Sequence, residues 1–372
     1  MKTKVVKINA ANIDSTKIQA AAELVDAGGL VAFPTETVYG IACHVAAESL
    51  AKLNAVKNRE SSKSYTLHIS RPDEIGKYVA SIGLRAAKLI GKAWPGPLTI
   101  VFELDEKEVE RRQQSLKSEV FQGLYRGNCI GVRCPDNAVA SALLRRTRHP
   151  VVAPSANIAG QAPAVDGQEA LAALGGKLDL VLDGGACKYG KNSTVAKIGK
   201  KGVEILRGGV YSDAEIKAFS QVKLLCVCTG NTCRSPMAEG FFRKYLAEKL
   251  QCEVDHLEQM GYKVASAGLL NMAGSSASSE SVAVCSARGV DIASHRSRPL
   301  SLGLIEESDR IFAMDRMHRA RVVALSPEAA NKCVLLAKDD ITDPIGQEQA
   351  FYKRCADLIE DAVKKRIGEF VL

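Results

Sequence analysis

Short apolar runs alternate with stretches of helical periodicity along the first 217 residues. Five runs have the length and composition of buried strands: 29–33, 66–69, 98–102, 151–153 and 178–182. Three stretches between them have the pattern of helices: 16–26, 49–57 and 136–146. The charge-dense segment 105–118 predicts an exposed helix or a surface insertion. Strands that alternate with helices are typical of an α/β layered domain.

A second unit begins near residue 220. Residues 222–227 form a continuous apolar run, which is typical of a strand buried in a parallel sheet, and 211–221 have the pattern of a short connecting helix. We therefore predict two α/β domains, 1–217 and 218–372. The length of 372 residues agrees with two domains.

Composition excludes several classes of protein. With 46% hydrophobic and 25% charged residues, the chain is neither disordered nor fibrous. No apolar run approaches the roughly 18 residues of a membrane span, and the N-terminus lacks the apolar segment of a secretion signal. The eleven cysteines follow neither a disulfide-like nor a zinc-like spacing. We therefore expect a cytoplasmic protein with no membrane association.

The net charge of +8 lies entirely in the first unit. Residues 1–217 contain 30 Lys and Arg against 22 Asp and Glu, whereas residues 218–372 contain 20 of each. A basic unit favours a polyanionic partner such as a nucleotide or RNA, although a solvated basic surface gives the same count.

The predicted strand at 222–227 leads directly into a loop that begins at Cys228 and reaches Pro236. We expect Pro236 at the first helical position and Ser235 as the N-cap. Backbone N–H groups of such a loop, together with the helix dipole, bind an anion, and Arg234 can hold a phosphate in a bidentate way. The same positive potential is expected to lower the pKa of the Cys228 thiol.

This segment resembles the active-site loop of low-molecular-weight protein tyrosine phosphatases, whose signature is Cys-x5-Arg followed by Ser or Thr. Further matches are 266–268, 311–315 and 343–344. The resemblance implies a small parallel-sheet α/β/α domain with no cofactor, a phosphoprotein substrate and a phosphocysteine intermediate. It also implies that Cys228 attacks phosphorus, Arg234 stabilises the transferring oxygens, Ser235 bonds the thiolate, and Asp343 is the general acid. The remaining residues of the implied phosphate-binding loop are Thr229, Gly230, Asn231, Thr232 and Cys233.

The residues around this loop bear on the substrate. Thr232 stands where tyrosine-directed members carry a larger aliphatic residue, and Ile345 follows the Asp-Pro pair where those members carry aromatic residues. The loop is more similar to that of the protein-arginine phosphatases, so we expect phosphoarginine ahead of phosphotyrosine. A tyrosine-only phosphatase and an arsenate reductase remain alternatives.

The first unit carries six short polar segments that are weak signals one by one. They combine hydroxyl, amide and cationic side chains at predicted strand ends and turns: 33–40, 57–63, 94–99, 154–157, 193–195 and 206–209. Cations within 57–63 suit a polyphosphate, although basic surface helices are common.

Together and in this order the segments resemble the YrdC-type L-threonylcarbamoyladenylate synthases. The resemblance implies an open twisted mixed sheet with helices and a reaction that joins L-threonine, bicarbonate and ATP, with Mg²⁺ carried by the nucleotide and no protein-bound metal. It also implies a connection to tRNA or to tRNA-modifying enzymes. The implied ATP contacts are Lys57, Arg59, Lys63, Ser155, Asn157 and Arg207, and the implied threonine contacts are Thr37, His68, Arg133 and Ser193. The alternative for this unit is an RNA-binding module without turnover.

Overall fold

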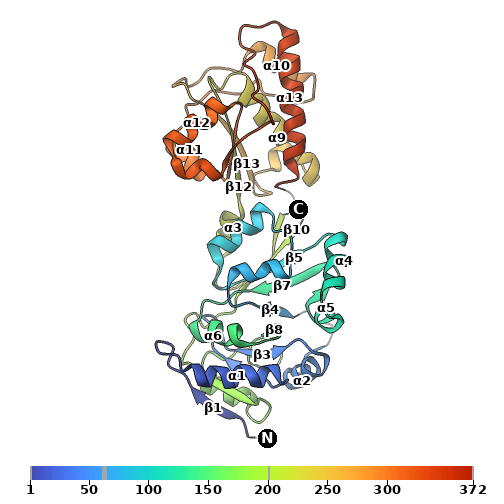
Figure 1. Cartoon of the computed structure of the whole chain (residues 1–372), viewed down its shortest axis with the longest axis vertical. Helices are drawn as coiled ribbons and strands as arrows, with labels where there is room; N and C mark the ends of the chain where they lie inside the picture. Colours follow the sequence, from blue (N-terminus) through green and yellow to red (C-terminus); the bar gives the residue numbers. More distant parts are fainter. Residues whose placement is uncertain (1, 61–64, 200–201, 371–372) are drawn as a thin grey trace. The chain divides into compact units, whose positions relative to one another are not determined.

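The structure is a computed structural model that describes residues 2–60, 65–199 and 202–370 (Figure 1). Contacts divide the chain into two compact units. One contains Met1–Ile82 and Ala86–Phe219, and the other contains Gly83–Arg85 and Ser220–Leu372. The exact domain boundary between residues 217 and 218 stays a prediction.

A large mixed sheet forms the centre of the first unit. In the described part of the chain its strands follow the order β1-β9-β2-β3-β8-β4-β7-β5-β10-β11, with β6 paired to β7. The strands are β1 (Lys4–Lys7), β2 (Val31–Phe33), β3 (Gly40–His44), β4 (Thr66–His68), β5 (Leu98–Glu103), β6 (Tyr125–Arg126), β7 (Cys129–Arg133), β8 (Val151–Val152), β9 (Leu180–Asp183), β10 (Thr194–Gly199) and β11 (Gly202–Arg207). The sheet contains both parallel pairs, such as β1 with β9 and β4 with β7, and antiparallel pairs, such as β2 with β3 and β5 with β7. The predicted open mixed sheet is therefore confirmed.

Helices cover this sheet on two sides. They are α1 (Ser15–Asp26), α2 (Ala47–Lys57), η1 (Pro72–Lys77), α3 (Leu84–Ala93), α4 (Glu106–Ser115), α5 (Ser118–Leu124), α6 (Ala138–Arg146), α7 (Gly167–Leu174) and α8 (Asp213–Ser220). Helix α1 begins where the Asp14 carboxylate accepts hydrogen bonds from the Thr16 and Lys17 N–H groups. Its apolar face packs with α6 against Val31 and Phe33 of β2.

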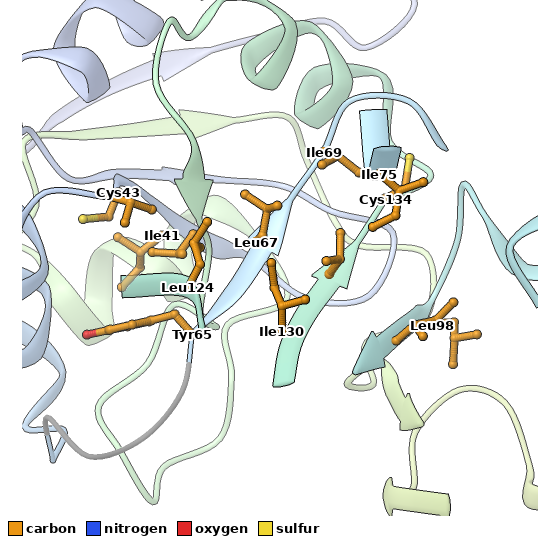
Figure 2. Packing of buried hydrophobic residues seen from close by; sticks show 14 of the residues in the cluster. Ile41, Cys43, Tyr65, Leu67, Ile69, Ile75, Leu98, Leu124, Ile130 and Cys134 are labelled. Carbon is orange, nitrogen blue, oxygen red and sulfur yellow. The ribbon is translucent and has the colours of Figure 1, made fainter. Parts of the chain in front are cut away.

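The opposite face of the sheet holds the larger apolar core. Figure 2 shows Ile41, Leu67 and Ile130 from three strands packed with Leu124 of α5. Burial of this face leaves the strand ends and the loops after them to carry the polar residues.

The second unit is a four-stranded parallel sheet in the order β13-β12-β14-β15. Its strands are β12 (Val222–Cys228), β13 (Tyr262–Gly268), β14 (Arg310–Ala313) and β15 (Cys333–Leu335). Its helices are α9 (Arg234–Leu250), η2 (Val254–His256), α10 (Ser279–Ser286), α11 (Leu302–Glu307), α12 (Arg316–Leu325), η3 (Pro327–Asn331) and α13 (Gln349–Ile367). Helices α9 and α13 lie on one side of the sheet and α11 and α12 on the other (Figure 1). This is the predicted α/β/α arrangement.

The start of α9 differs from the prediction. The helix begins at Arg234 with Cys233 at the N-cap position, so Pro236 is the third helical residue rather than the first. Ser235 does not cap the helix because its hydroxyl is used inside the loop, next to Cys228.

Across the described residues, no helix combines the length and the apolar character that a membrane crossing requires.

Candidate functional site

A polar cavity of about 210 Å³ opens at the strand ends of the first unit. Three arginines line it, and the described lining residues include no Asp or Glu. The lining residues are Thr35, Val38, Tyr39, Gly40, Arg59, Tyr65, Thr66, His68, Thr99, Arg133, Ala153, Pro154, Ser155, Asn192, Ser193, Val195 and Arg207. A small cavity with this concentration of positive charge favours an anionic ligand.

Arg133 is anchored by a buried ion pair. Its Nη2 donates to Glu36 Oε1 at 2.9 Å and to Thr37 Oγ1 at 2.7 Å, and the two charged side chains are 7% and 2% exposed. Glu36 Oε2 also accepts a hydrogen bond from the Asp136 N–H. Glu36 therefore fixes the position of Arg133 at the end of β7.

The other two arginines are held by different contacts. Arg207 Nη2 donates to the Ser193 carbonyl at 2.8 Å and to Ser193 Oγ at 3.1 Å, while the Arg59 guanidinium lies 4.9 Å from the centre of the Tyr65 ring. Burial lowers the pKa of both guanidinium groups, and the neighbouring Arg133 adds to the effect on Arg207. An incoming anion would relieve this electrostatic cost.

His68 places an acceptor at the cavity. Its Nδ1 lies 3.1 Å from the Thr66 carbonyl oxygen, and burial, assisted by the charge of Arg133, lowers its pKa to about 3. Because a carbonyl only accepts, the neutral ring carries its proton on Nδ1. Its Nε2 is buried and has no hydrogen-bond partner among the residues that the structure describes, so it can accept a hydrogen bond from a ligand.

Lys57 supports the cavity wall from behind. Its ammonium donates to the carbonyls of Ser155 and Asn157, the latter at 2.7 Å. Burial, with a smaller contribution from Arg59, lowers its pKa to about 8. Ser155 Oγ in turn donates to Asn157 Oδ1 at 2.6 Å. This network presents the Ser155 hydroxyl to the cavity.

The loop between β12 and α9 forms the centre of the second site. The Cys228 Sγ and Ser235 Oγ atoms lie 2.9 Å apart, and the Asn231 N–H donates to the sulfur at 3.3 Å. Cys228 is 2% exposed. The sulfur therefore lies at the bottom of a loop whose amides and following helix N-terminus favour an anion.

Asn231 holds this loop in shape from a left-handed conformation, with a φ of 55°. Its Nδ2 donates to Ser235 Oγ and Ser266 Oγ, each at 2.9 Å, and its Oδ1 accepts from the Arg298 N–H at 3.0 Å. Its carbonyl accepts from His295 Nε2 at 2.8 Å. Asparagine tolerates this conformation better than most residues, and two distant segments, around Ser266 and over 295–298, fix it here.

Arg234 lies between two carboxylates. Its Nη1 donates to the Ile341 carbonyl at 2.9 Å and to Asp315 Oδ2 at 3.3 Å, and its Nη2 pairs with Asp343 Oδ2 at 2.5 Å. The side chain of Asp343 is 36% exposed, so this carboxylate lies at the opening of the site.

A buried histidine connects this network to the loop. The Nε2 atom of His318 lies 2.9 Å from Thr229 Oγ1, and its Nδ1 lies 2.9 Å from Asp315 Oδ1. Burial lowers the pKa of His318, although Asp315 opposes the effect. The histidine therefore couples Thr229 to the residue that holds Arg234.

The thiol of Cys228 departs from our expectation. Burial raises its pKa above the ordinary value, whereas the Ser235 hydroxyl, the charge of Arg234 and the Asn231 N–H each lower it. The predicted lowering was wrong for the resting loop, because the sequence did not indicate how completely the sulfur is enclosed.

Comparisons with known proteins agree with the division into two units. The model of the Sua5/YciO/YrdC family, described as telomere recombination, matches residues 23–209. The chain belongs to this family. A threonylcarbamoyl-AMP synthase of Pyrococcus abyssi is 30% identical over 63% of this chain and 66% of its own length. A putative threonylcarbamoyl-AMP synthase of Methanocaldococcus jannaschii is 30% identical over 56% of this chain and 95% of its own length.

The Sua5/YciO/YrdC fold is also found among solved structures. A crystal structure of P. abyssi Sua5 complexed with L-threonine covers 71% of this chain and 92% of that chain, with 21% identity and a TM-score of 0.52. The chain spans 66%, 56% and 49% of the length of the first three curated relatives it matches.

The second unit has relatives of its own. The model of the low molecular weight phosphotyrosine protein phosphatase family matches residues 223–370. The low molecular weight protein tyrosine phosphatase of T. tengcongensis is 33% identical, covers 40% of this chain and 99% of that chain, and has a TM-score of 0.36. The match to the phosphatase family model thus follows the match to the Sua5/YciO/YrdC model along the chain.

Most residues predicted for the first site line one cavity. Those that do are Arg59, His68, Arg133, Ser155, Ser193 and Arg207. Thr37, Lys57 and Asn157 lie behind its walls, where they bond Arg133, Ser155 or each other. Lys63 lies outside the described residues. Their roles toward a ligand remain predictions.

In the second site, residues of the predicted loop surround Cys228, as the contacts of Asn231 and Ser235 with its sulfur show. Asp343, which is 109 positions away from Arg234 in the chain, contacts its guanidinium. Gly230 and Thr232 form the outer part of the loop, and Cys233 lies beside Ser278 and Tyr352. Their catalytic and binding roles likewise remain predictions.

Several residues of both sites were not predicted. In the first unit, Thr35 and Glu36 lie inside a polar segment that was recognised, and Asn192 directly precedes Ser193, so position in these segments was a usable signal. In the second unit, Asp315 ends the segment 311–315, whose resemblance to the phosphatase family was recognised, although its contact with Arg234 was not predicted. His295 and His318 gave no signal, because contacts between distant segments bring them to the loop.

Proposed function

We propose that the first unit is a threonylcarbamoyl-AMP synthase, which uses L-threonine, bicarbonate and ATP and releases pyrophosphate. The observation that carries this proposal is the cavity whose described lining residues include three arginines and no carboxylate. Its positive charge suits a triphosphate together with the carboxylate of an amino acid. The curated synthases among its relatives and the L-threonine complex of P. abyssi Sua5 support it.

In this proposal the cavity residues have two tasks. Arg59, Arg207 and the Ser155 hydroxyl bind the phosphates, with Lys57 and Asn157 positioning Ser155. The threonine carboxylate pairs with Arg133, which Thr37 helps to orient, while His68 Nε2 and the Ser193 hydroxyl bond the polar groups of the substrate. Lys63 is assigned to ATP from the motif alone.

The chemistry needs mainly positioning and charge neutralisation. The amine of threonine joins the carbon of bicarbonate to form a carbamate, with loss of water. A carbamate oxygen then attacks the α-phosphorus of ATP, and the bond to pyrophosphate breaks. Among the residues that the structure describes, no three His, Cys, Asp or Glu side chains form a group that could hold a metal ion. A Mg²⁺ ion bound to the triphosphate would add charge neutralisation from the substrate side.

Release of pyrophosphate from ATP, dependent on both threonine and bicarbonate, tests this activity on the full chain. The variant Arg59→Ala should abolish the release and leave phosphatase turnover unchanged. Unchanged release would refute the ATP assignment. RNA binding without any pyrophosphate release would favour the alternative of a binding module for tRNA or a related RNA.

For the second unit we propose a cysteine phosphatase that acts on phosphoproteins. In the bound complex the Cys228 thiol gives up its proton, which the Asp343 carboxylate takes up. The resulting thiolate attacks phosphorus, the bond to the leaving group breaks, and Asp343 donates that proton to the leaving group. Water then attacks the phosphocysteine, Asp343 accepts its proton, and phosphate leaves. Ser235 stabilises the thiolate, and Arg234 with the loop amides stabilises the transferring oxygens.

The ion pair between Arg234 and Asp343 implies that substrate binds before Asp343 acts as the general acid. A phosphate that binds Arg234 competes with the Asp343 carboxylate for the guanidinium. The phosphate oxygens replace the Asp343 carboxylate as the partner of Arg234. Since Asp343 lies at the mouth of the site, the released carboxyl group is then near the leaving group. Substrate binding thereby frees the general acid.

We further propose that phosphoarginine is preferred to phosphotyrosine. Thr232 offers a hydroxyl that a guanidinium can bond, and Ile345 supplies no aromatic surface for a phenol ring. A panel of phosphoarginine, phosphotyrosine and arsenate on the full chain separates this proposal from the tyrosine-only phosphatase and the arsenate reductase. The variant Cys228→Ser should abolish turnover of every phosphorylated compound.

A further inference from the structure

A buried histidine beside the loop of the second unit has no part in the phosphatase cycle proposed above. His318 lies in the first turn of α12, and its side chain is fully buried. Burial of a polar ring costs free energy unless its nitrogen atoms have partners. The partners of His318 are the residues that hold Arg234, so we ask what this ring does for the arginine.

His318 closes a ring of four side chains. Its Nε2 lies 2.9 Å from Thr229 Oγ1, and its Nδ1 lies 2.9 Å from Asp315 Oδ1. Arg234 completes the ring, because its Nη2 donates to Thr229 Oγ1 at 3.2 Å and its Nη1 donates to Asp315 Oδ2 at 3.3 Å. Both residues that His318 contacts are therefore also partners of the guanidinium.

The donors and acceptors of this ring fit one arrangement of protons. Because a guanidinium only donates, the Thr229 oxygen accepts from Arg234, and the Thr229 hydroxyl proton is left for His318 Nε2. The imidazole proton then lies on Nδ1, where it faces the Asp315 carboxylate. A neutral His318 therefore orients both the hydroxyl and the carboxylate that hold Arg234.

The ring leaves one donor of Arg234 for a ligand. Its Nη1 contacts Asp315 and the Ile341 carbonyl, and its Nη2 contacts Thr229 and Asp343. Its Nε is buried and has no hydrogen-bond partner within the described part of the chain. A phosphate that displaces Asp343 can therefore bond Nε and Nη2 together, in the bidentate geometry that suits a guanidinium.

We infer that His318 is a positioning residue of the phosphatase, which acts through Thr229 and Asp315 to align the Nε and Nη2 atoms of Arg234 with the transferring phosphoryl group. This inference rests on the phosphatase activity proposed above. A misaligned guanidinium still attracts a bound phosphate by its charge, but it no longer matches the oxygens of the transition state. The loss of His318 should therefore lower kcat more than it changes KM.

The test measures kcat and KM for p-nitrophenyl phosphate on the full chain. His318→Leu removes both polar contacts and should lower kcat about tenfold, with KM within about twofold of the wild type. His318→Gln keeps an amide oxygen that can accept from Thr229, so it should recover part of this loss. Orthovanadate, whose five-coordinate complex resembles the transition state, should bind His318→Leu about tenfold more weakly, whereas inorganic phosphate should bind it within about twofold of the wild type.

Substitution of Thr229 tests the route of the effect. Thr229→Val exchanges the hydroxyl for a methyl group and should also lower kcat about tenfold. Since either substitution breaks the same ring, the double variant Thr229→Val, His318→Leu should fall little below the single variants. Thr229→Val also tests the inference if His318→Leu does not fold, because unchanged kcat in that variant would refute it.

Val322→Ala is the matched control. Val322 lies one turn after His318 on α12 and is fully buried, but its side chain has no polar group. The substitution weakens the packing of the same helix and should leave kcat and orthovanadate binding within about twofold of the wild type. An equal loss of kcat in Val322→Ala would assign the effect to helix packing and refute the positioning role.

Two further outcomes would overturn the inference. One is a kcat of His318→Leu within twofold of the wild type, and the other is a double variant in which the two single losses multiply in full, since the residues would then act independently. Wild-type protein that fails to hydrolyse p-nitrophenyl phosphate instead refutes the proposed phosphatase itself, which distinguishes the two failures.

Discussion

Removal of the Glu36 carboxylate tests whether its buried ion pair with Arg133 stabilises the first unit. The variant Glu36→Ala leaves the Arg133 guanidinium, 7% exposed, without its counter-ion. Removing one partner of a buried ion pair costs about 3–5 kcal/mol, because the remaining charge is enclosed and unpaired. This is a large part of the about 5–15 kcal/mol that stabilises a typical domain.

The fluorescence of Trp94 reports specifically on unfolding of the first unit. Trp94 is the only tryptophan of the chain, it belongs to the first unit, and it is 6% exposed. Its fluorescence therefore follows unfolding of that unit in urea. With a slope of about 2 kcal/mol per molar urea, the loss corresponds to a midpoint lower by about 1.5–2.5 M. Phosphatase turnover of the same sample reports whether the second unit remains folded.

A second ion pair of equal length is the control. Lys197 Nζ and Glu103 Oε1 also lie 2.9 Å apart, but these side chains are 28% and 30% exposed. Ion pairs nearer to solvent contribute about 0–1 kcal/mol, so Glu103→Ala should shift the midpoint by less than about 0.5 M. Equal shifts for the two variants would refute the argument that burial makes the Glu36 pair important.

Three further predictions concern the two sites. In the folded protein the pKa of His68 is about 3, below the ordinary value of about 6.5, so the unfolded chain takes up a proton first as the pH falls. Acid should therefore destabilise the first unit between these two pH values and not above them. His68→Gln should flatten this pH dependence of stability in urea titrations followed by Trp94 fluorescence, and an unchanged slope would contradict the argument. Ser235→Ala should raise the pKa of Cys228 further, seen as a higher midpoint pH of iodoacetamide alkylation, because a hydrogen bond to the thiolate is lost. Thr232→Ile should shift kcat/KM toward phosphotyrosine and away from phosphoarginine; a wild type that already prefers phosphotyrosine tenfold, about 1.4 kcal/mol in barrier, would refute the arginine proposal.

Local patterns in the sequence determined the elements of the fold. The apolar run at 222–227 became β12 over Val222–Cys228, and the run at 98–102 became β5 over Leu98–Glu103. The charged segment at 105–118 contains α4, Glu106–Ser115. Periodicity and capping act between residues a few positions apart, so one sequence carries enough information to predict them. The order Cys228, Arg234, Ser235 likewise predicted an anion-binding loop between a strand and a helix.

Tertiary structure alone decided how the site residues interact. The sequence did not reveal that Glu36 neutralises Arg133 across 97 positions, or that Ser266, His295 and Arg298 hold Asn231 in its left-handed conformation. It also gave the wrong direction for the pKa of Cys228. Burial and contacts between distant segments set these properties, because both depend on which parts of the chain fold against each other. Motif residues thus predicted where the sites lie, while packing determined which charges are paired and which side chains line the cavity.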